Sequence, residues 1–179
     1  MSERGEHCIW ICSATYDALA HGLGRGSTTA GFLSSGSDPG FVERQFACPS
    51  VEAQLPFYGG VGGVGWVIGY NYLGNHAPIT AIHGWKSPTR LESKGNLPIF
   101  ADLNDWSPAD RWTCVPHQRD TAGGFFYGAM GGEPPDHPFF DAAGGNVALL
   151  DGSVVWRDIS EMKKYPTYNY SGTAYMGMW

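Results

Sequence analysis

The chain has 179 residues, which fits one domain and is long enough to bury a substantial hydrophobic core. Its net charge of −6, with no cluster of Lys or Arg, excludes a nucleic-acid-binding protein and disfavours anionic membrane surfaces, because phosphate recognition needs clustered cations. Only 16% of the residues are charged, whereas 26 are glycine and 12 are proline, a composition typical of short strands and ordered turns.

The first predicted element is an α-helix over residues 6–23. Cys8, Cys12, Tyr16 and Leu19 follow one another at intervals of three or four residues, the repeat of one helical face. The sequence has no run of about 20 apolar residues and no secretory apolar core at its N-terminus. We therefore expect no membrane-spanning helix in this sequence.

After a Gly-, Ser- and Thr-rich segment that predicts a surface loop, short strands are expected. They are apolar, β-branched or aromatic, and Gly, Pro or Asn residues separate them, as in an antiparallel sheet. The five segments are Gln45–Cys48, Gly65–Leu73, Ile79–His83, Leu97–Leu103 and Phe125–Met130.

The clearest local signal is a β-hairpin over Asn146–Arg157, where two apolar arms flank Asp151 and Gly152. An Asp-Gly pair tolerates positive φ and favours a type I′ turn. Residues 159–164 predict one helical turn. The segment 165–179 is aromatic and uncharged, so we expect it to dock on its own domain or on a neighbour.

Carboxylates in the predicted loops suggest a structural calcium site, because calcium prefers oxygen ligands clustered in loops. Solvated turn aspartates are the alternative interpretation. The calcium candidates are Asp102, Asp105, Asp141 and Asp151.

Enzymatic motifs are weak. The six histidines lack the H-x-x-x-H spacing of a helical zinc site, so zinc would need distant residues such as His83, His117 and His137 with Asp136. The G-x-G-x-x-G sequence at 60–65 precedes a strand pattern rather than a helix, which argues against a nucleotide site. No G-x-S-x-G elbow occurs. We assign no catalytic or cofactor-binding residue and expect no cofactor other than calcium.

The four cysteines are too few and too scattered for a disulfide scaffold. A pair between Cys48 and Cys114 would indicate an oxidising compartment, and buried thiols are the alternative. We expect five residues to have structural roles: Cys48, Cys114, Asn146, Asp151 and Gly152.

Four blocks together resemble the pseudopilin G-like proteins with a prepilin-type H-X9-DG domain. They are Phe46–Ser50, Gly69–Tyr72, Leu97–Asp102 and Gly144–Val154, and their order and approximate spacing match over residues 44–157. Two features depart from the family: Asp141 stands where its defining histidine is expected, and the prepilin leader is missing. Membrane insertion and peptidase processing are therefore not carried over.

The resemblance implies an α+β, pilin-like fold: an N-terminal helix packed on an antiparallel sheet with long Gly-rich loops. The expected parts are a helix at 1–24, a globular β-rich head at 25–164 and an aromatic tail at 165–179. It also implies a non-enzymatic structural subunit of an extracellular filament, secretion or cell-surface assembly, which acts through protein–protein contacts as a homo-oligomer or filament.

The residue types in this sequence are also compatible with two other functions. Exposed aromatic side chains stack on sugars, so a carbohydrate-binding module could use Trp85, Trp106, Trp112 and loop tyrosines. A metal-dependent hydrolase would need a cleft that contains at least three of the histidines and carboxylates.

Overall fold

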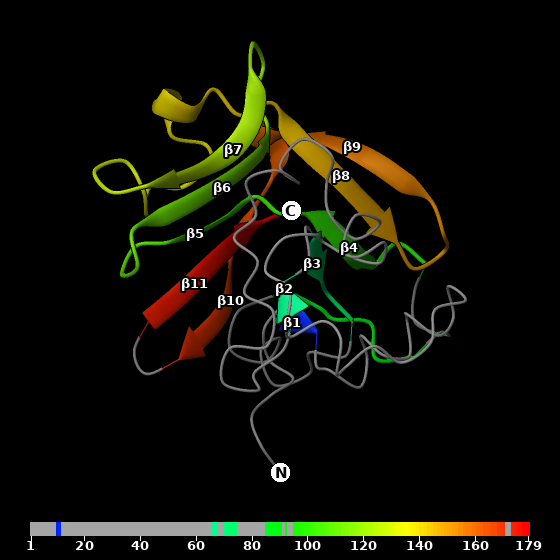
Figure 1. The fold of residues 1–179 in the computed structure, drawn as a ribbon. Coiled ribbons are helices and arrows are strands. Elements are labelled where there is room, and N and C mark those ends of the chain that lie inside the picture. Colours follow the sequence, from blue (N-terminus) through cyan, green and yellow to red (C-terminus); the bar gives the residue numbers. More distant parts are fainter. Residues whose placement is uncertain are drawn as a thin grey trace, which may run out of the picture.

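The computed structural model describes residues 10–11, 66–67, 70–74, 85–90, 92, 95–170 and 173–179. These residues form antiparallel strands joined by turns, with two short 3-10 helices (Figure 1). In the described part of the chain, no helix has the length and apolar character needed to cross a membrane.

The strands form three sheets. A two-stranded sheet pairs β1 (Trp10–Ile11) with β2 (Trp66–Val67). The five-stranded sheet has the order β10 (Lys164–Tyr170), β11 (Thr173–Met178), β5 (Asp105–Ser107), β6 (Trp112–His117) and β7 (Ala122–Tyr127). The four-stranded sheet has the order β3 (Tyr70–Tyr72), β4 (Pro98–Asp102), β8 (Gly144–Leu149) and β9 (Val154–Asp158). The 3-10 helices are η2 (Pro138–Phe140) and η3 (Ile159–Glu161).

The expected α+β, pilin-like fold is wrong, because the described residues are mostly antiparallel strands and include no N-terminal helix packed on a sheet. Trp10 and Ile11, inside the expected helix over residues 6–23, instead form strand β1 against β2. Isoleucine and tryptophan fit the pleated surface of a strand well and are only moderate helix formers. A helical spacing of apolar residues was therefore not enough to specify a helix. The remainder of the expected helix lies outside the described residues.

The other strand expectations are mostly correct where they can be compared. The segment Gly65–Leu73 contains β2 and β3, and Leu97–Leu103 contains β4. The segment Phe125–Met130 overlaps β7, but that strand begins at Ala122 and ends at Tyr127. The segments Gln45–Cys48 and Ile79–His83 lie outside the described residues. The helical turn expected in residues 159–164 is confirmed as η3.

The β8–β9 hairpin is confirmed, but its expected type I′ turn is wrong. A type I′ turn needs positive φ at both central residues. Gly152 has φ +87, whereas Asp151 is not among the residues with positive φ. The Leu149 N–H donates to Ser153 O, and the Gly152 N–H donates to Leu149 O. This pattern is that of a three-residue loop, in which glycine occupies the left-handed position after a type I turn.

The aromatic segment at 165–179 docks on its own domain. Strands β10 and β11 form a hairpin, and β11 adds this hairpin to the five-stranded sheet through β5. Trp179 is buried against Trp85, with ring centroids 5.1 Å apart, and against Tyr165, with centroids 4.7 Å apart. These rings share a hydrophobic cluster with Leu73 and Val147 of the four-stranded sheet region. The chain's last residues therefore help to join the two larger sheets.

Candidate functional site

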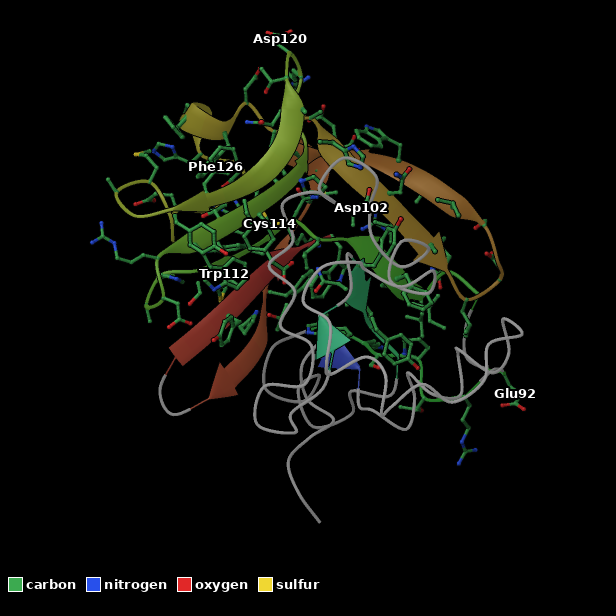
Figure 2. All side chains as sticks on the ribbon, viewed as in Figure 1. Glu92, Asp102, Trp112, Cys114, Asp120 and Phe126 are labelled. Carbon is green, nitrogen blue, oxygen red and sulfur yellow. The ribbon has the colours of Figure 1, made fainter. Side chains whose placement is uncertain are left out.

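The polar centre of the protein lies on residues 101–107, which run from β4 of one sheet into β5 of the other. All seven residues are buried. They include the carboxylates of Asp102 and Asp105 and the amide of Asn104, which are costly to bury without hydrogen-bond partners. Figure 2 shows Asp102 close to β4 and β8, on the side of the four-stranded sheet nearest the five-stranded one.

Asp102 is held by two other strands. Its Oδ2 atom accepts from the backbone N–H of Asn146 at 2.6 Å and from Asn146 Nδ2 at 3.0 Å. The same oxygen lies 2.9 Å from His117 Nε2. Asn146 comes from β8 and His117 from β6, so one carboxylate oxygen connects β4, β8 and β6. Asp102 is only 2% exposed, so protein groups take the place of water around this oxygen.

An aromatic ring flanks this polar group. The His117 and Trp156 rings have centroids 5.3 Å apart and meet edge to face. The strand register also places Trp156 opposite Asn146, and Tyr70 opposite Asp102. One row of side chains therefore crosses one face of the four-stranded sheet, with buried Asp102 in β4 and an exposed tryptophan at the β9 end.

Asp105 lies in a different environment. Its Oδ1 atom accepts from Asn71 Nδ2 at 2.6 Å, and its Oδ2 atom has no hydrogen-bond partner among the described residues. Burial raises the pKa of Asp105 to about 8, although the Asn71 hydrogen bond acts in the opposite direction. A Cβ at Gly177 would lie 2.8 Å from Oδ1, so a glycine there makes room for the carboxyl group. Asp105 is therefore a neutral acid at pH 7.

Asn104 joins the same region to η3 and β8. Its Nδ2 donates to the Gly144 carbonyl at 3.2 Å and approaches the Met162 sulfur at 3.7 Å. Its Oδ1 has no hydrogen-bond partner within the described part of the chain. These contacts tie the crossing segment to the structure around it.

The four calcium candidates do not converge. Asp141 is exposed at the end of η2 and lies 3.7 Å from Arg119 Nε, while Asp151 is exposed and accepts from the backbone and hydroxyl of Ser153. Asp102 and Asp105 are buried with different partners. Over the described ranges, no three His, Cys, Asp or Glu side chains are close enough to hold a metal ion.

The residues named for a zinc site are also dispersed. His117 contacts Asp102, whereas His137 caps η2 and accepts from the Phe139 N–H at 3.2 Å. Asp136 pairs with Lys164 at 2.7 Å. His83 lies outside the described residues.

Of the expected structural residues, Asn146 holds Asp102, while Asp151 and Gly152 shape the β8–β9 loop. Cys114 is buried in β6. Cys48 lies outside the described residues, so its pairing with Cys114 stays a prediction.

The tryptophans proposed for sugar binding separate into two groups. Trp85 and Trp106 are buried and unsuited to ligand contact. Trp112 is half-buried on the five-stranded sheet, with ring centroids 5.6 Å from Phe125 and 5.8 Å from Tyr175. Tyr127 continues this aromatic row and stacks on Phe125 at 5.8 Å.

The β9 edge is a surface that the sequence reasoning missed. Val154, Val155 and Trp156 are consecutive and are 62%, 37% and 50% exposed. Strand β9 is at the end of its sheet, and no described strand pairs with its outer side (Figure 1). The hairpin pattern identified these residues as strand, but local sequence does not show which strand is left at an edge. The sequence also contained no sign of Asn71, the partner of Asp105, because the two residues are 34 positions apart in the chain.

Comparisons with protein-family models, curated proteins and solved structures found no match to this chain. The resemblance to the H-X9-DG proteins therefore rests on the four sequence blocks alone.

Proposed function

We propose that the protein is a non-enzymatic subunit of an extracellular or cell-surface assembly, and that it acts through protein–protein contacts made by the edge of β9. The observation that carries this proposal is the exposure of Val154, Val155 and Trp156 in succession on an edge strand. Soluble proteins usually protect such edges with charges, prolines or bulges. An apolar edge that no described strand covers is typical of a strand that has a partner.

The contacts of Asp102 support a structural role for this carboxylate. A general base needs a lone pair directed at its substrate. The Asp102 oxygen that faces His117 already accepts two hydrogen bonds from Asn146, and its carboxyl group is buried. These contacts hold three strands together without requiring a reaction.

The proposal does not depend on a helical spine, because the expected N-terminal helix was wrong. The extracellular location and the assembly come from the resemblance to H-X9-DG proteins. What the structure contributes is a surface through which such a subunit could make contact.

Photo-crosslinking in the producing cells tests the proposal. Benzoylphenylalanine placed at Val155 should give covalent protein adducts, because this position lies in the proposed contact. The matched control is Asp120, which is also exposed and lies at the far tip of the β6–β7 turn (Figure 2). Adduct formation at Val155 no greater than at Asp120 would contradict the proposal.

Carbohydrate binding is a second candidate, because Trp112, Phe125, Tyr127 and Tyr175 form a row of rings on one sheet face. Such rings can stack on the apolar faces of sugars. A glycan array probed with the wild-type protein and with Trp112→Ala tests this function. Binding that survives the substitution, or no binding at all, would exclude this use of the row.

A further inference from the structure

The backbone pattern of the β8–β9 hairpin determines which β9 groups face outward. In an antiparallel pair, hydrogen-bonded residues alternate with residues whose N–H and C=O groups point away. The Leu149 N–H donates to Ser153 O, and the Ile159 N–H donates to Ala143 O, so the odd-numbered residues of this strand bond to β8. The N–H and C=O groups of Val154 and Trp156 therefore point toward the open edge.

This parity allows only a few ways for two copies of β9 to pair around a two-fold axis. With the axis at Val155, Val154 of each copy lies opposite Trp156 of the other, and the two Val155 residues face each other. All three apolar residues are then opposite apolar residues. With the axis at Trp156, Val155 would oppose Arg157 and Val154 would oppose Asp158. With the axis at Val154, Trp156 would oppose Gly152 in the loop. The Val155 register is the self-complementary one.

Charge is also complementary in the Val155 register. Arg157 of each copy lies opposite Ser153 of the other, next to the loop that carries Asp151. Asp151 is ionised at neutral pH, because the hydroxyl and backbone N–H of Ser153 hold the pKa of its carboxyl below the usual range. Asp151 lies in the loop two residues before Ser153, so the long Arg157 side chain of the other copy could extend past Ser153 toward it. In this register the two-fold axis would place one such Arg–Asp pair on each side.

We propose that the partner of the β9 edge is a second copy of this chain, with the two β9 strands paired antiparallel about Val155 so that the two four-stranded sheets become continuous. This inference rests on the proposed function and names its partner. The contact involves few residues, so the association is weak and depends on protein concentration.

Disulfide trapping tests the register. The two Val155 residues form a non-hydrogen-bonded pair with Cα atoms about 4.5 Å apart, which is within disulfide range. Val155→Cys should therefore link two copies under mild oxidation, and peptide mass spectrometry should identify the 155–155 bond despite the natural cysteines. In the matched control Val154→Cys, the two cysteines are offset along the strands by two residues, roughly 7 Å, and should not link. A bond formed instead by Trp156→Cys would overturn the register.

Sedimentation of the purified full chain tests the association. The mass of the wild-type protein should rise from 19.4 kDa toward twice that value as concentration increases. Val155→Lys places two like charges at the axis and should keep the protein monomeric. Its melting temperature should stay near that of the wild type because Val155 is a partly exposed edge residue. A wild-type protein that stays monomeric at every soluble concentration, together with a Val155→Cys variant that forms no 155–155 bond, would overturn the inference.

The cellular crosslinks separate this inference from the proposed function. Adducts at Val155 with the mass of two chains support both. Adducts only with a different protein leave the proposed function standing and overturn the second copy as partner. An absence of adducts at Val155 contradicts both.

Discussion

The buried carboxyl of Asp105 should make the stability of this protein fall as pH rises. In the folded state its pKa is raised to about 8 from an ordinary value of 3.8, because the side chain is wholly buried. Between these two values the folded chain keeps a proton that the unfolded chain has released. Each unit of pH then lowers the free energy of unfolding by about 1.4 kcal/mol. This loss of stability begins near the ordinary pKa of Asp105 and levels off above its folded-state pKa.

Asp105→Asn should remove this dependence. Asparagine resembles the protonated acid in shape, and its Oδ1 can accept the Asn71 hydrogen bond. From pH 5 to pH 7, the stability of the variant relative to the wild type should increase by about 2.7 kcal/mol. The comparison cancels the contributions of the other titrating groups, which the two proteins share.

Urea unfolding followed by tryptophan fluorescence at pH 5, 6 and 7 measures this difference. Asp151→Asn is the matched control, because the Ser153 hydrogen bonds lower the pKa of that carboxyl and its contribution to stability is lost only as pH falls. The relative stability of this control should stay nearly constant from pH 5 to 7. If the unfolding free energies of Asp105→Asn and the wild type change with pH by the same amount over this range, Asp105 is not a neutral acid in the folded protein.

Four further substitutions test the packing. Gly152→Val should cost about 1–2 kcal/mol, because φ is +87 and no neighbouring atom crowds the new side chain; a melting temperature equal to the wild type would contradict the loop geometry. Asp102→Ala should cost about 3 kcal/mol in urea unfolding, since Asn146 and His117 lose their shared acceptor, and His117→Ala should cost less. Trp179→Ala should lower the free energy of unfolding by about 3–5 kcal/mol, because a large buried ring is lost. A loss as small as that of an exposed side chain would show that this ring does not join the two sheets.

The sequence correctly predicted those structural elements that depend on neighbouring residues. The Asp-Gly hairpin, strand β4 and the helical turn η3 were expected, because turn residues and short apolar runs favour these structures wherever they occur. The type I′ turn expected in the β8–β9 hairpin was wrong, because an Asp-Gly pair does not by itself determine whether the loop has two or three residues. The N-terminal helix was wrong because the helical spacing of Cys8, Cys12 and Tyr16 did not exclude a strand at Trp10 and Ile11, two residue types that fit a strand well.

The polar centre was only partly predictable. Asp102, Asp105 and Asn146 were singled out as oxygen-bearing residues, but calcium was expected to bring the carboxylates together. The contacts join residues far apart in the chain: Asp102 and Asn146 are separated by 44 positions, and Asn71 and Asp105 by 34. No local pattern indicates such pairs.

The sequence by itself therefore determined a β-rich protein with short strands, glycine turns and a reliable Asp-Gly hairpin, because these depend on residues close together in the chain. Tertiary structure alone decided that β11 pairs with β5, that β9 is left at an edge, and that Asp105 is neutral while Asp102 connects three strands. These outcomes depend on which distant segments meet and on how much water they exclude, and neither quantity is set by neighbouring residues.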